Sequence, residues 1–196
     1  MKKFFFIFLT LFLSSLLYAN QKEEFPSVND IYSLLLTNSE SKKIQIVSPK
    51  TEFNEISFQK NKKEIQESKK RLKKDLKVSG YNTKSLIDKI FEINQESVPL
   101  TLTSDIQKGY IVNYEDRYSK YFKKNGFGGW PNFRKENPEM GCFISFSLPA
   151  IDEKKGYILI YQSFTCDAIW GSGNFFLYRY LDGQLKLIKH SMAWIS

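Results

Sequence analysis

The sequence predicts an α+β protein in which N-terminal helices pack on a C-terminal antiparallel sheet of about four to five strands. Two observations predict this class. Residues 141–196 alternate short aromatic and β-branched runs with Gly, Pro and Asp turns, as consecutive antiparallel strands do. Before them, residues 27–37, 60–77 and 83–125 carry apolar side chains mostly at helical spacing. Helices grouped before strands indicate an α+β architecture, and a curved-sheet pocket is one arrangement compatible with that order.

Residues 1–19 are predicted to be a cleaved signal peptide, followed by a single domain over residues 20–196. Two lysines precede the apolar run 4–17, and Ala19 offers a small residue for cleavage. The alternative is a retained membrane anchor, but this run is shorter than the roughly 20 apolar residues of a span. We therefore expect an exported protein, periplasmic or secreted, with no stable membrane span after cleavage.

The N-terminal part of the domain, residues 20–59, is expected to contain one helix and one strand. Ser27 can cap the helix, and the polar run 38–41 ends it. Residues 43–47 alternate as a short strand, and Phe53, Ile56 and Phe58 give a weaker extended signal.

The basic helix predicted over residues 60–77 carries the positive charge of the chain. It has nine basic and three acidic residues, which is the whole basic excess once residues 1–19 are removed. Ile65, Leu72 and Leu76 form a narrow apolar stripe, so we expect a solvated helix along the domain edge.

The lysines of this helix also form a candidate basic face for an anionic partner, with Lys69, Lys70, Lys73 and Lys74 at its centre. No aromatic residues lie between the lysines to stack on bases, so no nucleic acid partner is expected. There is also no broad apolar face for insertion into a membrane. Binding to an anionic surface would therefore depend on charge alone.

Residues 83–125 are predicted to hold two further helices. Thr83 can cap the first, whose broad apolar face should form core. The second is expected to begin at Asn113 and to end at Asn125-Gly126. Its aromatic stripe is more often core than a ligand site, and consists of Tyr114, Tyr118, Tyr121 and Phe122.

The strands are expected to follow a bridge rich in Gly and Pro, which Trp130 and Phe133 should pin to the sheet. Asp182-Gly183 predicts a two-residue hairpin turn, and Gly171-Ser172-Gly173 predicts a flexible bend. The expected strands are residues 142–148, 157–166, 174–181, 185–190 and a final short one over 192–195.

The two cysteines of the chain, Cys142 and Cys166, are predicted to form a disulfide bond. An oxidising compartment permits it, and a hairpin of residues 143–148 with 157–165 would bring the two positions together across the ladder. The alternative is a pair of buried free thiols.

Few residues carry recognisable chemistry. His190 is the only histidine, so a metal site is not expected, and no cofactor motif is present. Asp167 and His190 are the residues on which a hydrolase acting on envelope sugars or peptides would depend. A thiolate at Cys166 could pair with His190 as nucleophile and base, but a disulfide would remove that thiolate.

A candidate ligand site is predicted at the rim of the sheet, around Asp167, Trp170 and Ser172, with Trp130 as a further aromatic residue. An acid beside an aromatic ring at a sheet rim can bind a sugar or a peptide. Catalytic residues and metal ligands are not assigned.

Several motifs lie between residues 84 and 196. They include Trp130-x2-Phe133, Pro138-x2-Gly141, Ser145 with Ser147, Tyr161 with Cys166, Gly171-x-Gly173, Asp182-Gly183 and the final Trp194-Ile195-Ser196. This spacing resembles a group of uncharacterised exported bacterial proteins. The resemblance implies a small α+β domain of the envelope with no known activity, so no functional residue is carried over. The chain departs from the pattern in lacking a glycine after Cys166 and in carrying Leu185-Lys186 where an aromatic residue is usual.

The leading functional hypothesis is therefore an exported, non-enzymatic domain that binds a protein or an envelope component. A cystatin-like or nuclear-transport-factor-like sheet is compatible with it only as an analogy of fold. The alternatives are the envelope hydrolase using Asp167 or His190, and anionic-surface binding through residues 60–77.

Overall fold

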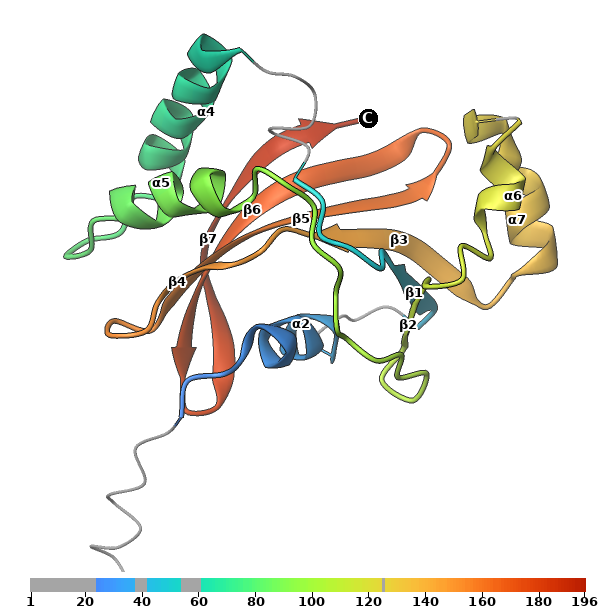
Figure 1. Cartoon of the computed structure of the whole chain (residues 1–196), viewed down its shortest axis with the longest axis horizontal. Coiled ribbons are helices and arrows are strands. Elements are labelled where there is room, and N and C mark those ends of the chain that lie inside the picture. The colour runs from blue at the N-terminus through green and yellow to red at the C-terminus, as the bar shows by residue number, and fades with distance from the viewer. Residues whose placement is uncertain (1–23, 38–41, 54–60, 125) are drawn as a thin grey trace, which may run out of the picture.

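The computed structural model of the chain describes residues 24–37, 42–53, 61–124 and 126–196 (Figure 1). Every helix of the described residues ends by Glu136, and five of the seven strands follow it, which confirms the predicted α+β class. The signal segment predicted for residues 1–19 lies outside the described residues, as do Ile56 and Phe58. No helix in the described part is long and apolar enough to cross a membrane.

Seven strands of the described residues form one sheet, in the order β2-β1-β3-β5-β6-β7 with β4 paired to β5. β1 is parallel to β2 and to β3, and the remaining pairs are antiparallel. The strands are β1 (Ile44–Val47), β2 (Tyr110–Val112), β3 (Met140–Phe146), β4 (Ala150–Asp152), β5 (Tyr157–Asp167), β6 (Trp170–Leu181) and β7 (Gln184–Ile195).

The sheet has seven strands, more than the four to five that the sequence predicts. The sequence predicts β1 without indicating its partner, and it does not predict β2 or β4. Both of these are only three residues long, too short for an alternating pattern to be visible. β1 and β2 also pair with strands far away in the sequence, which local patterns do not report.

The helices begin where side chains can satisfy their first backbone amides. At α2 (Val28–Thr37), Asp30 N donates to Ser27 Oγ over 3.2 Å, and Ser27 N donates to Asp30 Oδ2 over 3.0 Å. The predicted cap at Ser27 is therefore confirmed. The remaining helices are α4 (Lys62–Asp75), α5 (Lys84–Ile93), α6 (Ser119–Phe122), the 3₁₀ turn η1 (Gly126–Gly129) and α7 (Trp130–Glu136).

Of two further predicted helix starts, one is right and one is wrong. Thr83 occupies the N-cap position of α5 as predicted, although its side chain makes no capping hydrogen bond; Lys84 N donates instead to Asn82 Oδ1 over 3.0 Å. The helix expected from Asn113 begins only at Ser119, because Asn113 Oδ1 accepts a hydrogen bond from Arg117 N and holds a turn. Asp116 adopts a φ of 50° within that turn, which an α-helix does not allow.

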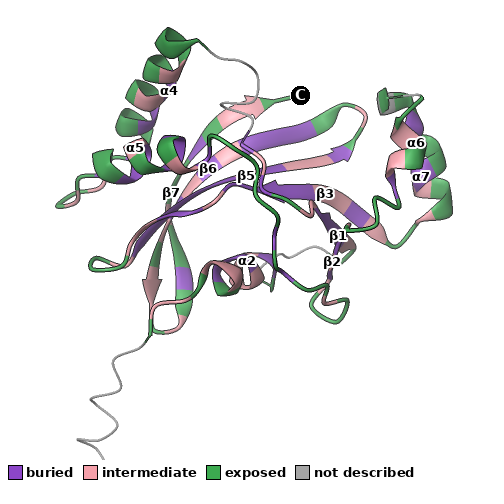
Figure 2. Cartoon of the chain, viewed as in Figure 1, coloured by how far each residue is buried: buried purple, intermediate pink, exposed green. Residues whose placement is uncertain are grey.

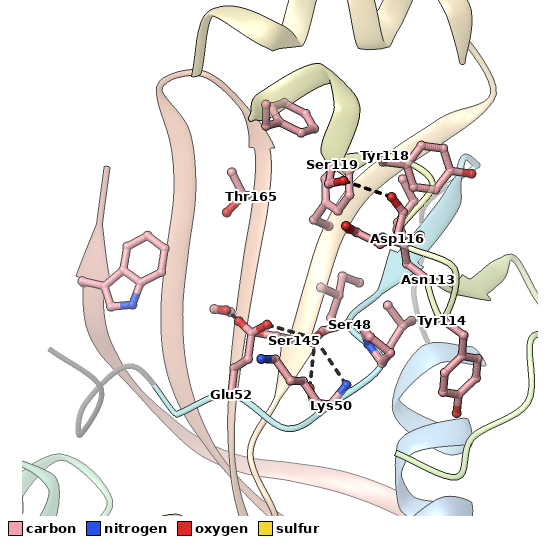
Figure 3. A pocket seen from close by; sticks show the side chains of 18 residues that line it. Ser48, Lys50, Glu52, Asn113, Tyr114, Asp116, Tyr118, Ser119, Ser145 and Thr165 are labelled. Carbon is pink, nitrogen blue, oxygen red and sulfur yellow. Dashed lines mark hydrogen bonds between the residues drawn. The ribbon is translucent and has the colours of Figure 1, made fainter. Parts of the chain in front are cut away.

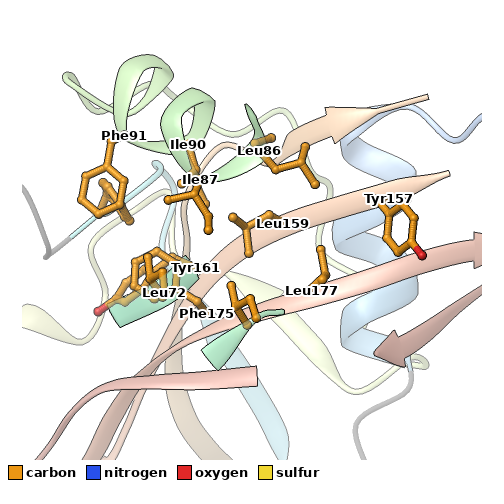
Figure 4. Packing of buried hydrophobic residues seen from close by; sticks show 13 residues of the cluster. Leu72, Leu86, Ile87, Ile90, Phe91, Tyr157, Leu159, Tyr161, Phe175 and Leu177 are labelled. Atoms are coloured by element: carbon orange, nitrogen blue, oxygen red, sulfur yellow. The ribbon is translucent and has the colours of Figure 1, made fainter. Parts of the chain in front are cut away.

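One face of the sheet, called face A here, is covered at one end by α4 and α5. Side chains on a strand alternate between faces, so Leu159 and Tyr161 of β5 point to face A together with Phe175 and Leu177 of β6. These residues pack against apolar side chains of the two helices, namely Leu72, Leu86, Ile87, Ile90 and Phe91 (Figure 4).

The opposite end of face A is covered by α6 and α7, so the two helix pairs lie at the two ends of the sheet (Figure 1). Trp130 and Phe133 of α7 are buried with Tyr118 against Ile46 of β1 and Phe143 of β3. Trp130 and Phe133 thus hold the bridge to the sheet as predicted, although the bridge itself is partly helical.

The other face, face B, is covered by α2 and by the segment that carries Leu100 and Leu102. Tyr32 and Leu36 of α2 pack there against Phe146 and Ile160. Figure 2 shows buried residues along β5, whereas most residues of α4 are exposed.

Of three predictions about the turns and the crosslink of the sheet, two are confirmed and one is wrong. Asp182 and Gly183 have φ values of 53° and 72° and form the two-residue turn between β6 and β7. Cys142 and Cys166 are bonded, which confirms the predicted disulfide. The bend expected at Gly171-Ser172-Gly173 is wrong: these residues lie inside β6, paired with β5. The chain turns earlier, between Asp167 and Trp170.

Candidate functional site

A groove runs over face A between its two helix-covered ends. It consists of a polar chamber of about 550 Å³ and an apolar chamber of about 340 Å³. Phe122, Phe143 and Thr165 line both chambers, so the two are contiguous. We call the combined feature the two-chamber groove.

The floor of the polar chamber is made by small hydroxyl side chains of β3 and β5. Ser145 and Ser163 lie directly opposite each other, and their Oγ atoms are 2.6 Å apart. Thr165 is the next residue of β5 on the same face. Where helices cover face A, β5 presents Leu159 and Tyr161 instead. The groove therefore exists because the side chains become small between the two helix pairs.

One wall of the polar chamber is the segment that follows β1. Its backbone lies along β3, because Ser48 N donates to Ile144 O and Glu52 N donates to Phe146 O, each over 2.8 Å. The Ser48 hydroxyl donates to the Glu52 carboxylate over 2.9 Å (Figure 3). Lys50 is exposed at the edge of the chamber. This wall presents a carboxylate, a hydroxyl and an ammonium group.

The opposite wall is the turn that leads into α6, with Asn113, Asp116 and Ser119. Ser119 Oγ donates to Asp116 O over 3.1 Å, and Lys123 Nζ lies 3.5 Å from Asp116 Oδ2. Tyr118 contributes a ring from the same turn, and burial raises the pKa of its phenol. Tyr118 is uncharged at neutral pH, as an ordinary tyrosine is, and its burial extends this to more alkaline pH.

Trp194 of β7 also lines the polar chamber. Its Nε1 donates to Tyr161 Oη over 2.7 Å. This contact requires a glycine at position 173, because a Cβ there would lie 2.2 Å from Trp194 Nε1 and 2.3 Å from Tyr161 Oη. The glycines that looked like a bend thus permit a close approach of side chains.

The apolar chamber is lined by Phe122, Gly126, Trp130, Phe143 and Thr165. The Thr165 hydroxyl is the single side-chain oxygen in that lining. Trp130 and Phe143 are held by edge-to-face contacts, with ring centroids 5.7 Å apart. α7 itself is fastened by Arg134, whose Nη1 donates to Met140 O over 2.6 Å and to Gly141 O over 2.9 Å. Its Nη2 donates to Cys166 O.

The site predicted at the sheet rim is not one open site. Asp167 is exposed at the β5–β6 turn, where it accepts a hydrogen bond from Ala168 N over 2.7 Å. Trp170 is 63% exposed beside it, but Ser172 is buried at 7%. Trp130 is 2% exposed and belongs to the apolar chamber. Only Asp167 and Trp170 are therefore neighbours at the surface.

Asp167 and His190 are also far apart. Asp167 pairs with Trp170 and His190 with Phe176, which are six positions apart on β6 and so separated by roughly 20 Å. His190 is exposed. Among the described residues, no group of three or more His, Cys, Asp or Glu side chains is placed to hold a metal ion.

The predicted basic face on α4 is smaller than expected. Lys69 turns towards α5, where its Nζ lies 3.1 Å from Asp88 Oδ1 and 5.3 Å from the centre of the Phe91 ring. Lys70, Lys73 and Lys74 are exposed. Leu72 and Leu76 are fully buried, and Ile65 is half-buried, as the apolar stripe predicted.

The sequence patterns do not assign most residues of the groove to a site. Ser145 belongs only to the resemblance with exported proteins, and Ser163, Thr165, Ser48 and Glu52 belong to no predicted site. One local signal was available: Ser163 and Thr165 continue the alternation of Leu159 and Tyr161 with small polar residues. Comparison of the chain with protein-family models, curated proteins and solved structures finds no match.

Proposed function

We propose that this chain is an exported, non-enzymatic binding domain, and that its partner, a lipid or cell-wall component of the envelope, occupies the two-chamber groove. One observation carries the proposal. Face A is packed with large apolar side chains at both ends, but between them it presents the paired hydroxyls of Ser145 and Ser163 under a cavity of about 550 Å³. A concave site with an apolar part and a few polar groups is the usual form of a ligand site.

Export is part of the same proposal. It is supported by the pattern of residues 1–19, which lies outside the described residues, and by the Cys142–Cys166 bond, since such bonds persist in oxidising compartments. The resemblance to exported bacterial envelope proteins is consistent with it.

The proposal is tested by blocking the groove where the chambers meet. Thr165→Phe puts a ring into that position, and Thr103→Phe adds the same ring at an exposed residue outside the groove. Two probes are titrated against the full chain, a total lipid extract of bacterial envelopes and a soluble digest of peptidoglycan. Trp130 and Trp194 line the groove, so their fluorescence reports occupancy.

We expect one probe to change the tryptophan emission of the wild-type protein and of Thr103→Phe, and to leave Thr165→Phe unchanged. Equal responses of all three proteins, or no response to either probe, would contradict the proposal. Thermal unfolding of each variant establishes that it is folded.

A second candidate function, binding to an anionic surface through α4, is favoured by one observation. At 100° per residue, Lys70, Lys73 and Lys74 lie within an arc of about 100° on the helix. All three are exposed, and none has an ion pair within the described residues. Changing these three lysines to Glu should abolish binding to vesicles containing anionic lipid. The same change at Lys124, Lys135 and Lys154 should not. Binding that persists in 0.5 M salt would exclude a mechanism based on exposed charge.

A further inference from the structure

The two chambers of the groove differ sharply in chemistry. The polar chamber has hydroxyl groups on its floor and an amide and carboxylates on its walls, whereas the apolar chamber is lined by three aromatic rings, a glycine and Thr165. The chambers meet at Thr165, whose methyl and hydroxyl groups suit both. A molecule that fills the whole groove must therefore have an apolar end and a hydrogen-bonding end.

The apolar chamber is large enough for a substantial group. A cavity of 150 Å³ lined by apolar side chains binds benzene, and this chamber has about 340 Å³. A fused aromatic ring system or a short acyl chain fits such a volume. Water gains little there, because the lining offers it one side-chain hydroxyl.

The polar chamber favours a head group without net charge. Ser145, Ser163 and Thr165 can each donate and accept a hydrogen bond, so they suit hydroxyl or amide groups. Each charge near the chamber has a charge of opposite sign close to it. Lys50 and Glu52 lie on the same wall, and Asp116 is paired with Lys123. A full charge on the ligand would meet no concentrated charge of the opposite sign.

We infer that the groove binds an uncharged amphiphile, with its apolar group between Phe122, Trp130 and Phe143 and its hydroxylated or amide head over Ser145 and Ser163. This inference rests on the proposed function and specifies its ligand class. The head hydrogen-bonds to the serine pair, and burial of the apolar group supplies most of the affinity.

The inference is tested with n-alkyl glucosides from butyl to octyl, below their micelle concentrations, titrated against the full chain. Each added methylene should tighten binding about fourfold, because burying one stabilises a complex by about 0.8 kcal/mol. Octyl sulfate and octyltrimethylammonium, which carry the same chain on charged heads, should bind at least tenfold more weakly than octyl glucoside.

Two sets of variants separate the chambers. Phe122→Ala should flatten the dependence on chain length, whereas Lys124→Ala, at an exposed residue nearby, should not. Ser145→Ala with Ser163→Ala should weaken all glucosides by about the same factor and keep the dependence on chain length. Thr165→Phe provides a check on the groove that does not require Phe122→Ala to fold.

Three outcomes would overturn the inference: affinity independent of chain length, tighter binding of either charged amphiphile, or glucoside binding that Thr165→Phe does not reduce. If envelope extract still binds in a Thr165-dependent manner, only the ligand class is wrong. If neither extract, digest nor glucosides bind, the proposed function fails as well.

Discussion

At the scale of single residues, the groove depends on side chains that are small in particular places. Ser145 and Ser163 leave space over the strands, and Gly173 allows Trp194 to reach Tyr161. Tyr161 is fully buried and cannot move aside easily. The position of the Trp194 ring in the groove is therefore set by the absence of a side chain at residue 173.

Gly173→Ala should lower the free energy of unfolding by about 2 kcal/mol, because its methyl group would overlap both Trp194 and Tyr161. Urea unfolding measures the change. Trp194→Phe removes one of the overlapping atoms, so the double variant Gly173→Ala/Trp194→Phe should lose less than the two single changes added together. A Gly173→Ala protein as stable as the wild type would show that the strands can separate at low cost.

A second prediction at this scale concerns Tyr178, whose pKa burial raises to about 12. The unfolded state releases its phenolic proton near pH 10, whereas the folded state holds it longer. The stability that this difference provides is complete below pH 10 and is lost as pH rises towards 12. Burial also raises the pKa of Tyr32 and Tyr81, in the same direction.

Tyr178→Phe should therefore show a weaker loss of stability between about pH 10 and pH 12 than the wild-type protein does. Urea midpoints at several alkaline pH values give both slopes. Identical slopes would mean that the Tyr178 phenol ionises equally well in the folded protein.

At the scale of elements, the short α7 matters more than its length suggests. Its two rings, Trp130 and Phe133, fill the space between Tyr118 and Phe143, and Trp130 closes the apolar chamber. Arg134 fastens the helix to both β3 and β5 through three backbone carbonyl groups. A seven-residue helix has little stability of its own, so these contacts hold the end of the groove in place.

Arg134→Met should lower the free energy of unfolding by about 2 kcal/mol, because it keeps much of the packing but leaves three partly buried carbonyl groups without their charged donor. Hydrogen exchange should also become faster over residues 126–136. Arg117→Met is the matched control, since Arg117 forms an exposed pair with Glu115 and should change stability by under about 1 kcal/mol. Similar losses in the two variants would contradict a special role for Arg134.

At the scale of the whole molecule, the helices of the described residues pack on the two faces of one sheet. A covalent bond joins the two central strands of this sheet beside the groove. Cys142 and Cys166 lie next to Phe143 and Thr165, which pair with each other and line both chambers. The bond therefore restrains the strand positions at which the chambers meet.

Replacing both cysteines by serine should lower stability by about 3 kcal/mol, as expected for a loop of 24 residues in the unfolded chain. The wild-type protein should fall to a similar stability in reductant, whereas the serine variant should not respond to it. A mass that does not rise by 2 Da on reduction would show that the bond is absent from the protein in solution.

The sequence by itself determined the α+β class, the three longer helices, the turn at Asp182-Gly183 and the cysteine pairing. Most of these features depend on neighbours in the chain: Ser27 caps α2, and the stripe of Leu72 and Leu76 defines the buried side of α4. The cysteine pairing could be predicted because the chain has only two cysteines. Caps, turns and amphipathic stripes depend on residues that are close together in the chain, so the sequence could predict these features.

Only the tertiary structure decided where the candidate site lies. The groove brings together Ser48, Asp116, Ser145, Thr165 and Trp194. These residues are far apart in the chain, and none of them belongs to a recognisable site motif. Their meeting depends on β1 joining β3 in parallel and on two helix pairs covering opposite ends of one face. Such long-range pairings follow from the packing of the whole chain, which a local pattern does not contain. The two cysteines, which stand out in the sequence, crosslink the strands beside the groove, whereas small residues such as Ser145 and Ser163 form its floor.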